Sequence, residues 1–257
     1  MTWQPASGER DTETGYEPEP DPIDWHEVVD YLFVGAGNTA LAAAIAAQAA
    51  GYEVLAADAK PPTGHDTLAV RLGLTDSVTV AYLNQLTEDA GPPATGAEPA
   101  VLDVFDPAAI APQKHFFGSR LRDWAVKCLG SPYGLLCTTP TEPPATPLPV
   151  GHLDTTAALD LSSWLSQRAG DIGIDDLEGT LSSLVFLDGK VRGAVVDTAS
   201  GECWVRAVGG VVIATGAGAA LPQLPAGAHD AARLDLALAS RAASRFIRLE
   251  LVAADRD

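Results

Sequence analysis

The chain has few basic residues, few cysteines and a single methionine. Its 257 residues include 16 lysines and arginines against 34 aspartates and glutamates, which gives a formal net charge of −18. Such a charge repels a phosphate backbone and an anionic lipid surface alike, so we expect no nucleic acid partner and no membrane insertion. Because 47% of the residues are hydrophobic, the chain can still bury a substantial core.

The three cysteines, Cys128, Cys137 and Cys203, are odd in number and widely spaced. A disulfide framework is therefore not expected, and a reduced cytoplasmic setting fits this pattern. The sequence shows no signal peptide at its start and no apolar stretch long enough to cross a membrane. The five histidines are scattered without metal-site spacing, so we expect no metal.

Acidic residues and prolines are concentrated near the N-terminus, between Glu9 and Asp24. This composition predicts a solvated, disordered acidic tail over residues 1–28. The remaining residues, 29–257, would then form one folded domain. Within it, residues 67–152 contain proline-rich and glycine-rich stretches that predict a partly irregular insert.

An apolar strand that ends at Val34 runs directly into the segment Gly35-Ala36-Gly37-Asn38-Thr39-Ala40. Gly35 permits a tight turn, Gly37 lets the backbone approach a pyrophosphate, and Ala40 keeps the following helix close to its strand. The helix N-terminus offers unpaired N–H groups and a favourable dipole to that phosphate. The segment therefore predicts a dinucleotide site.

The next residues extend this pattern with a helical run over 41–50 and a second strand over Tyr52–Ala57. That strand ends at Asp58, about 20 residues past the turn, where a carboxylate would accept hydrogen bonds from a ribose. Two alternatives stay open. The glycines could form a tight turn without any ligand, and the unit alone does not separate FAD from NAD.

Hydrophobic periodicity predicts further helices over 76–89, 120–129, 154–169 and 231–246. Asp76 or Ser77 would cap the first of these and Asp154 the third. Short strands are predicted over 180–187, 190–197 and 202–207, with Asp188-Gly189 forming a hairpin turn of the primed type. A separate apolar strand is predicted over 209–216.

Four segments taken together resemble the flavoprotein group of fumarate reductase and succinate dehydrogenase subunits and 3-ketosteroid Δ1-dehydrogenases. They are Trp25–Gly37, Gly51–Asp58, Gly189–Val195 with Val211–Gly216, and His229–Ala239. The resemblance implies a three-layer α/β, Rossmann-like FAD-binding fold with a parallel sheet, a β-meander and a small irregular insert. It also implies FAD as the cofactor.

The same resemblance implies individual contacts with FAD. The pyrophosphate would lie on the turn of Gly35, Ala36, Gly37, Asn38, Thr39 and Ala40. The ribose would lie on Asp58, where the group usually has glutamate, followed by Ala59 and Lys60. Backbone near Leu181 would face the adenine, while Thr215 and Gly216 would pass close to the pyrophosphate.

Two departures from this group limit the inference from binding to catalysis. The group's flavin-lining loop has paired glycines and a serine, whereas this chain has Gly64-His65-Asp66-Thr67-Leu68. The sequence given also ends at Asp257, before the group's catalytic half. We therefore expect an FAD-binding oxidoreductase-like protein whose active site needs a partner chain or a second copy. The alternatives are a non-catalytic scaffold or regulatory protein on a degenerate flavin-binding fold, and an NAD-binding protein.

No catalytic residue can be assigned from the sequence. His65-Asp66 is typical of a solvated loop, and the aromatic residues near His115 and Trp124 are typical of a core. Tyr133 lacks a visible partner for proton transfer. Cys128 and Cys137 lack a neighbouring base in the sequence, so inert buried thiols are expected.

Overall fold

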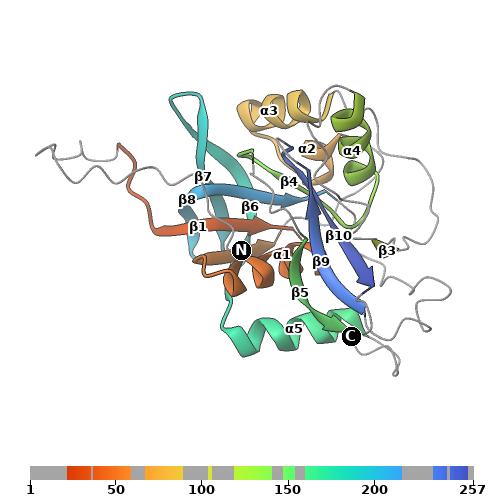
Figure 1. Ribbon diagram of the computed structural model, residues 1–257. Helices are drawn as coiled ribbons and strands as arrows, with labels where there is room; N and C mark the ends of the chain where they lie inside the picture. Colours follow the sequence, from red (N-terminus) through yellow and green to blue (C-terminus); the bar gives the residue numbers. More distant parts are fainter. Residues whose placement is uncertain are drawn as a thin grey trace, which may run out of the picture.

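The computed structural model describes residues 22–35, 37–58, 67–88, 104–105, 119–140, 147–153, 160–215, 234–241 and 244–253. These residues form one mixed ten-stranded sheet with helices on both faces (Figure 1), which confirms the α/β class. Helices α2, α3 and α4 contribute to the core on one face, and α1 and α5 to the core on the other.

The centre of the sheet is parallel. Strand β1 pairs in parallel with β2 on one side and with β8 on the other, and β2 pairs in parallel with the start of β6. Helix α1 connects β1 to β2 in the predicted βαβ unit. The bounds are β1 Glu27–Val34, α1 Asn38–Ala49, β2 Val54–Asp58, β6 Asp175–Leu187 and β8 Gly201–Ala214. Strand β1 thus begins two residues before the predicted domain boundary at residue 29.

The predicted meander is formed by β6, β7 (Lys190–Thr198) and β8. Its first turn has positive φ at both Asp188 (51°) and Gly189 (71°), which confirms the primed hairpin. The prediction of separate strands over 202–207 and 209–216 is wrong, because β8 runs unbroken from the meander into the parallel sheet. Gly210, at φ +130°, lies beside the register shift between Val29 and Tyr31 and allows the strand to bend there.

Antiparallel strands extend the sheet beyond β8, in the order β4, β10, β9 and β5, and we call these four strands the antiparallel wing. The short strand β3 (Val104–Phe105) pairs with β10. The bounds of the wing strands are β4 Gly134–Cys137, β5 Leu148–Leu153, β9 Leu234–Ser240 and β10 Phe246–Ala253.

The predicted helix over 231–246 is wrong, because this stretch contains β9 and the start of β10. Leu234, Leu236 and Leu238 alternate along β9 and are all buried. Leucine and alanine favour helices intrinsically, but this period of two lets β9 pair with strands on both sides. Strand β5, in a stretch predicted to be irregular, tolerates Pro149 because β5 is the outer strand of the wing.

Two helix caps show how the helices begin. The backbone N–H of Thr79 donates to the Asp76 carboxylate at 2.7 Å, as predicted for the start of α3. Helix α5 begins at Leu161 rather than at 154, and Asp160 caps it through the N–H of Ser162 at 3.1 Å; Asp154 lies outside the described residues. The helix bounds are α2 Leu68–Arg71, α3 Ser77–Glu88, α4 Ser119–Leu129 and α5 Leu161–Ile172.

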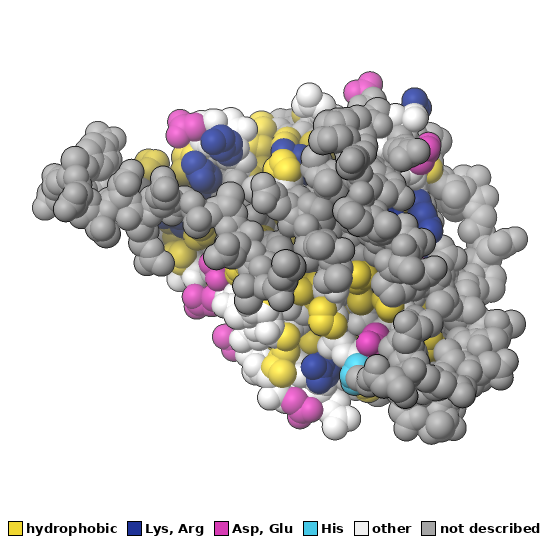
Figure 2. Space-filling model, in the orientation of Figure 1, with side chains coloured by type: hydrophobic (Ala, Val, Ile, Leu, Met, Phe, Trp, Pro, Cys, Tyr) yellow, Lys and Arg dark blue, Asp and Glu magenta, His cyan; other side chains and the backbone are white. Residues whose placement is uncertain are grey.

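An apolar groove lies where α1 meets the wing. Its lining includes Tyr52 after α1, Leu148 of β5, Leu238 of β9 and Ile247 of β10. Figure 2, drawn in the orientation of Figure 1, shows hydrophobic side chains gathered near the middle of the drawn face. The rings of Tyr31 and Tyr52, which both line the groove, meet edge to face with their centres 5.4 Å apart.

Candidate functional site

The turn after β1 depends on glycine at two positions. Gly35 has φ +148° and Gly37 has φ +116°, both in the region that favours glycine. The N–H of Gly35 donates to the carbonyl of Ala57 at 3.1 Å. A Cβ atom on Gly35 would lie 2.5 Å from the Cβ of Ala214. The turn is therefore packed tightly between β2 and β8. This packing places the N-terminus of α1 next to the end of β1.

The N-terminus of α1 has the character of an anion site. Gly37 is its N-cap residue and provides no side-chain cap, and the first turn contains no acidic residue. The helix that follows consists mainly of alanine and is mostly buried, so its backbone approaches the sheet closely. Unpaired N–H groups and the helix dipole at this end favour a negatively charged group.

A cleft of about 340 Å³ opens beside this helix terminus, within the range of small-ligand sites. It is bounded by the glycine turn, the end of β2, the start of β6 and one face of α5. The lining residues are Gly35, Gly37, Asn38, Ala40, Leu41, Ala56, Ala57, Asp58, Ser162, Ser166, Ala169, Gly170, Ile174 and Asp176. Small side chains dominate, so backbone surrounds much of the space.

Two carboxylates from neighbouring strands face this cleft. Asp58 ends β2, and Asp176 of β6 pairs in register with Ala56. Burial raises the pKa of Asp176 above its ordinary value, and the charges of Asp58 and Glu178 raise it further. Sequence reasoning missed Asp176 because it placed the start of this strand at Thr180. The acidic pair Asp175-Asp176, which begins two residues after the helix-ending Gly173, was the signal that could have indicated it.

The structure brings five of the predicted cofactor residues together in the cleft, namely Gly35, Gly37, Asn38, Ala40 and Asp58. These residues fit a dinucleotide diphosphate, because Gly37 and Asn38 place the start of α1 in the cleft and the first turn of that helix contains no acidic residue. Predicted residues Ala36, Ala59, Lys60 and Gly216 lie outside the described residues.

Three other predicted cofactor residues make hydrogen bonds or packing contacts within the protein. The hydroxyl of Thr39 donates to the carbonyl of Pro132 at 3.2 Å. Thr215 donates its N–H to Gly134 at 2.9 Å and its hydroxyl to Cys128 at 3.3 Å. Leu181 is buried in the core that includes residues of α3. The described contacts of the Thr39 and Thr215 side chains are therefore structural, and the expectation that backbone near Leu181 faces the adenine stays a prediction.

The candidate proton donors and nucleophiles that the structure describes are buried. Burial raises the pKa values of the Tyr133 hydroxyl and of the Cys128 and Cys137 thiols, so all three stay protonated at neutral pH. None of them lines the cleft. His65, Asp66 and His115 lie outside the described residues. Across the described part of the chain, no group of three or more His, Cys, Asp or Glu side chains could hold a metal.

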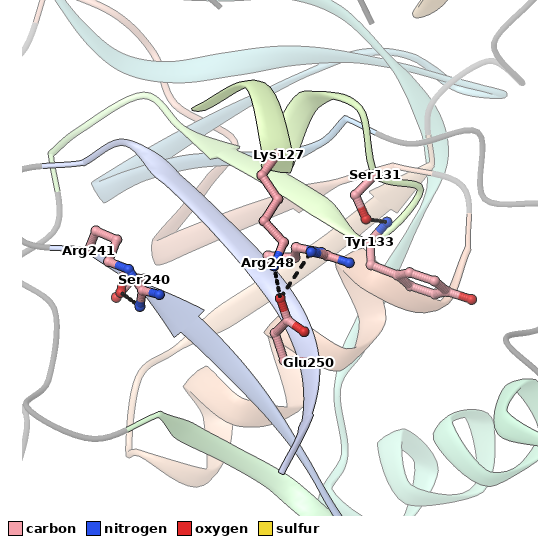
Figure 3. A network of polar contacts seen from close by, with 7 residues as sticks. All are labelled: Lys127, Ser131, Tyr133, Ser240, Arg241, Arg248 and Glu250. Atoms are coloured by element: carbon pink, nitrogen blue, oxygen red, sulfur yellow. Dashed lines mark hydrogen bonds and ion pairs between the residues drawn. The ribbon is translucent and has the colours of Figure 1, made fainter. Parts of the chain in front are cut away.

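A separate polar network joins α4 to β10 in the wing (Figure 3). Arg248 and Glu250, both almost fully buried, form an ion pair of 3.2 Å, and Lys127 approaches Glu250 at 4.0 Å. Arg241 lies over the ring of Trp124, with its guanidinium carbon 4.3 Å from the ring centre. These contacts hold α4 against the wing.

In the described part of the chain, no helix is both long and apolar enough to cross a membrane.

No protein-family model matches the chain, and neither does any curated protein. Among solved structures, the chain is similar to a 3-ketosteroid Δ4-(5α)-dehydrogenase from Rhodococcus jostii RHA1, with 19% identity over 75% of this chain and 46% of that chain, at a TM-score of 0.36. It is similar to a flavocytochrome c3 fumarate reductase, with 19% identity over 71% of this chain and 33% of that chain, at a TM-score of 0.32.

A third similar structure is CndH, a myxobacterial FAD-dependent chondrochloren halogenase. It shares 12% identity over 70% of this chain and 36% of its own, at a TM-score of 0.29. The chain thus spans less than half the length of each of these three proteins. A ketosteroid dehydrogenase and a fumarate reductase are also the kinds of protein that the sequence motifs resemble.

Proposed function

We propose that this chain binds FAD in the cleft beside α1. The observation that carries the proposal is the convergence of the glycine turn, the N-terminus of α1 and the Asp58 carboxylate in one cleft. The diphosphate would lie on the helix terminus, where negative charge is favoured, and the adenosine ribose would donate hydrogen bonds to Asp58.

The meander supports FAD over NAD in this proposal. A βαβ unit alone serves either cofactor, but β6, β7 and β8 supply the additional meander that the sequence resemblance associates with FAD. The carboxylates of Asp58 and Asp176 would also repel a 2′-phosphate, which disfavours NADP.

We further propose that the protein is an oxidoreductase component whose chemistry is completed outside the described cleft. Among the described residues that line it, the polar side chains are those of aspartate, serine and asparagine. This set can bind a dinucleotide, and among its side chains only the two aspartates are groups that commonly transfer protons. We propose Asp58 for the ribose, and a protein partner or a second copy would provide further catalytic groups. The three free thiols fit a cytoplasmic location.

The same lining also suits the alternative of a nucleotide-binding regulatory protein without catalysis. Reduction of an electron-acceptor dye by the FAD-loaded protein, with a steroid or a dicarboxylate supplied as the electron donor and with the activity abolished together with FAD binding, would decide against this alternative. An FAD-loaded protein that leaves the dye unreduced with either donor would favour it.

The proposal is tested by the absorbance spectrum of the purified protein after incubation with FAD and gel filtration. The wild type should retain flavin, whereas Gly37→Asp should lose it because the variant places a negative charge and backbone strain at the diphosphate position. Gly201→Asp is the matched control, since Gly201 has a similar φ of +122° but lies at the start of β8 with open space around it. A colourless wild type, or equal flavin retention by Gly37→Asp, would contradict the proposal.

A further inference from the structure

The α5 side of the cleft forms a wall of small residues. Ser162, Ser166, Ala169 and Gly170 lie on one face of this helix and line the cleft. A glycine inside a helix is less favourable than alanine by up to about 1 kcal/mol. A Cβ on Gly170 would meet no atom within 4 Å, so packing within the protein does not require glycine there. The wall leaves room for a flat group.

The neighbouring strands β1, β2 and β6 would align with the diphosphate, the ribose and the base of a nucleotide, in that order along the cleft. The diphosphate position lies at the turn after β1, and the ribose position lies at Asp58 on β2. Neighbouring strands are about 4.8 Å apart, close to the step from a ribose to its base. The base therefore falls over the next strand, β6, between the α5 wall and Asp176.

Asp176 has the chemistry to distinguish one base from another. Its carboxylate only accepts hydrogen bonds when it is ionised. Adenine presents an amino donor at its 6-position, whereas guanine presents a carbonyl acceptor there. Among the described residues, none donates a hydrogen bond to this carboxylate. Asp176 is exposed at the cleft, and partial desolvation together with the negative charges of Asp58 and Glu178 disfavours its ionised form. A donor from the ligand would relieve this repulsion.

We propose that Asp176 is a specificity-determining residue that selects adenine over guanine by accepting a hydrogen bond from the 6-amino group. The proposal rests on the proposed function, because it requires a nucleotide in the cleft. It does not depend on flavin, so the probes are ADP and GDP, which contain the base, ribose and diphosphate alone.

The test is a calorimetric titration of the full chain with ADP and with GDP. The wild type should bind ADP about tenfold or more tighter than GDP. Asp176→Asn should lose most of this preference, because an amide can donate to the guanine carbonyl as well as accept from adenine. Asp175→Asn is the matched control, since Asp175 precedes it on the same strand and projects to the other face.

The titration distinguishes failure of base selection from failure of nucleotide binding. Equal affinity of the wild type for ADP and GDP, or an unchanged preference in Asp176→Asn, overturns base selection by Asp176 while nucleotide binding stands. If the wild type binds neither nucleotide, both the proposed function and this inference are overturned.

A second variant tests the position of the base independently of charge. Gly170→Leu should fill the space beside the α5 wall and weaken ADP binding by about tenfold or more. Its thermal unfolding should still be cooperative, because leucine is a better helix former than glycine and its Cβ meets open space. The control is Gln167→Leu on the same helix, outside the cleft lining. Unchanged ADP affinity in Gly170→Leu would overturn the placement of the base.

Discussion

Single residues at the end of β1 determine whether the cleft can form. Gly35 donates its N–H to β2 and packs its Cα against Ala214 of β8, so the two strands that flank β1 fix the turn from both sides. Asn38 and Ala40 then face the cleft, while Thr39 turns away to bond the carbonyl of Pro132. The described residues of the motif therefore divide into groups that line the cleft and groups that hold the fold.

Replacing Gly35 by alanine should destabilise the protein by about 2 kcal/mol or more, because the new Cβ meets Ala214 and the backbone has positive φ. Urea unfolding followed by circular dichroism measures this cost. Gly51→Ala is the control, because Gly51 also has positive φ, at +92°, but has open space around it. A Gly35→Ala variant as stable as Gly51→Ala would contradict the packing described for the turn.

Replacing Asp176 by asparagine should stabilise the protein at neutral pH. The folded state raises the pKa of Asp176, so folding disfavours its ionised form, and this cost is present at pH values above that raised pKa. The gain should stay below about 1 kcal/mol because solvent screens an exposed charge. It should fade as the pH falls through the raised pKa towards the ordinary aspartate value. Thermal unfolding at several pH values checks this, and a neutral or destabilising effect at pH 7 would contradict it.

At the scale of elements, turns and helix caps are predicted correctly where the residues of the turn or cap determine them. The turn at Asp188-Gly189 and the cap at Asp76 follow from the residues themselves, because positive φ and side-chain capping need few distant contacts. Strand β9 was mistaken for a helix because its leucines and alanines favour helix, and only pairing with β5 and β10 makes it a strand.

The cap of α3 gives a prediction at this scale. Asp76→Ala should cost about 1 kcal/mol of stability, because the N–H of Thr79 loses its acceptor. Hydrogen bonds from Thr79 lower the pKa of Asp76, so the stabilisation is present above the ordinary aspartate value and is lost as the pH falls through the lowered one. Chemical unfolding near pH 7 and near pH 3 should show a smaller difference at the acidic pH. Asp76→Asn, which keeps an acceptor, should retain most of the stability, and a loss equal to that of alanine would contradict the capping role.

At the scale of the whole molecule, the parallel strands have no open edge on the side of β8. Strand β4 pairs with β8 there, and the antiparallel wing continues beyond it. At the far edge, α5 packs over β5, and Arg168 donates to the carbonyl of Val150 at 2.9 Å. We therefore propose that a partner completing the active site approaches the cleft rather than these strand edges.

The cleft itself was only partly predictable from the sequence. The glycine turn and Asp58 follow from one continuous βαβ pattern, which local spacing reveals. Gly170 and Asp176 reach the cleft only because α5 packs beside α1 and β6 pairs with β2. Such contacts join residues more than 100 positions apart, and no local pattern encodes them.

The measurement that tests the central claim most directly is a fluorescence titration of FAD with the purified full chain, followed by competition with ADP. The account predicts saturable binding of one FAD per chain, which ADP displaces because its diphosphate and adenosine would occupy the cleft beside α1. FAD that shows no saturable binding, or bound FAD that excess ADP leaves in place, would contradict a dinucleotide site in this cleft.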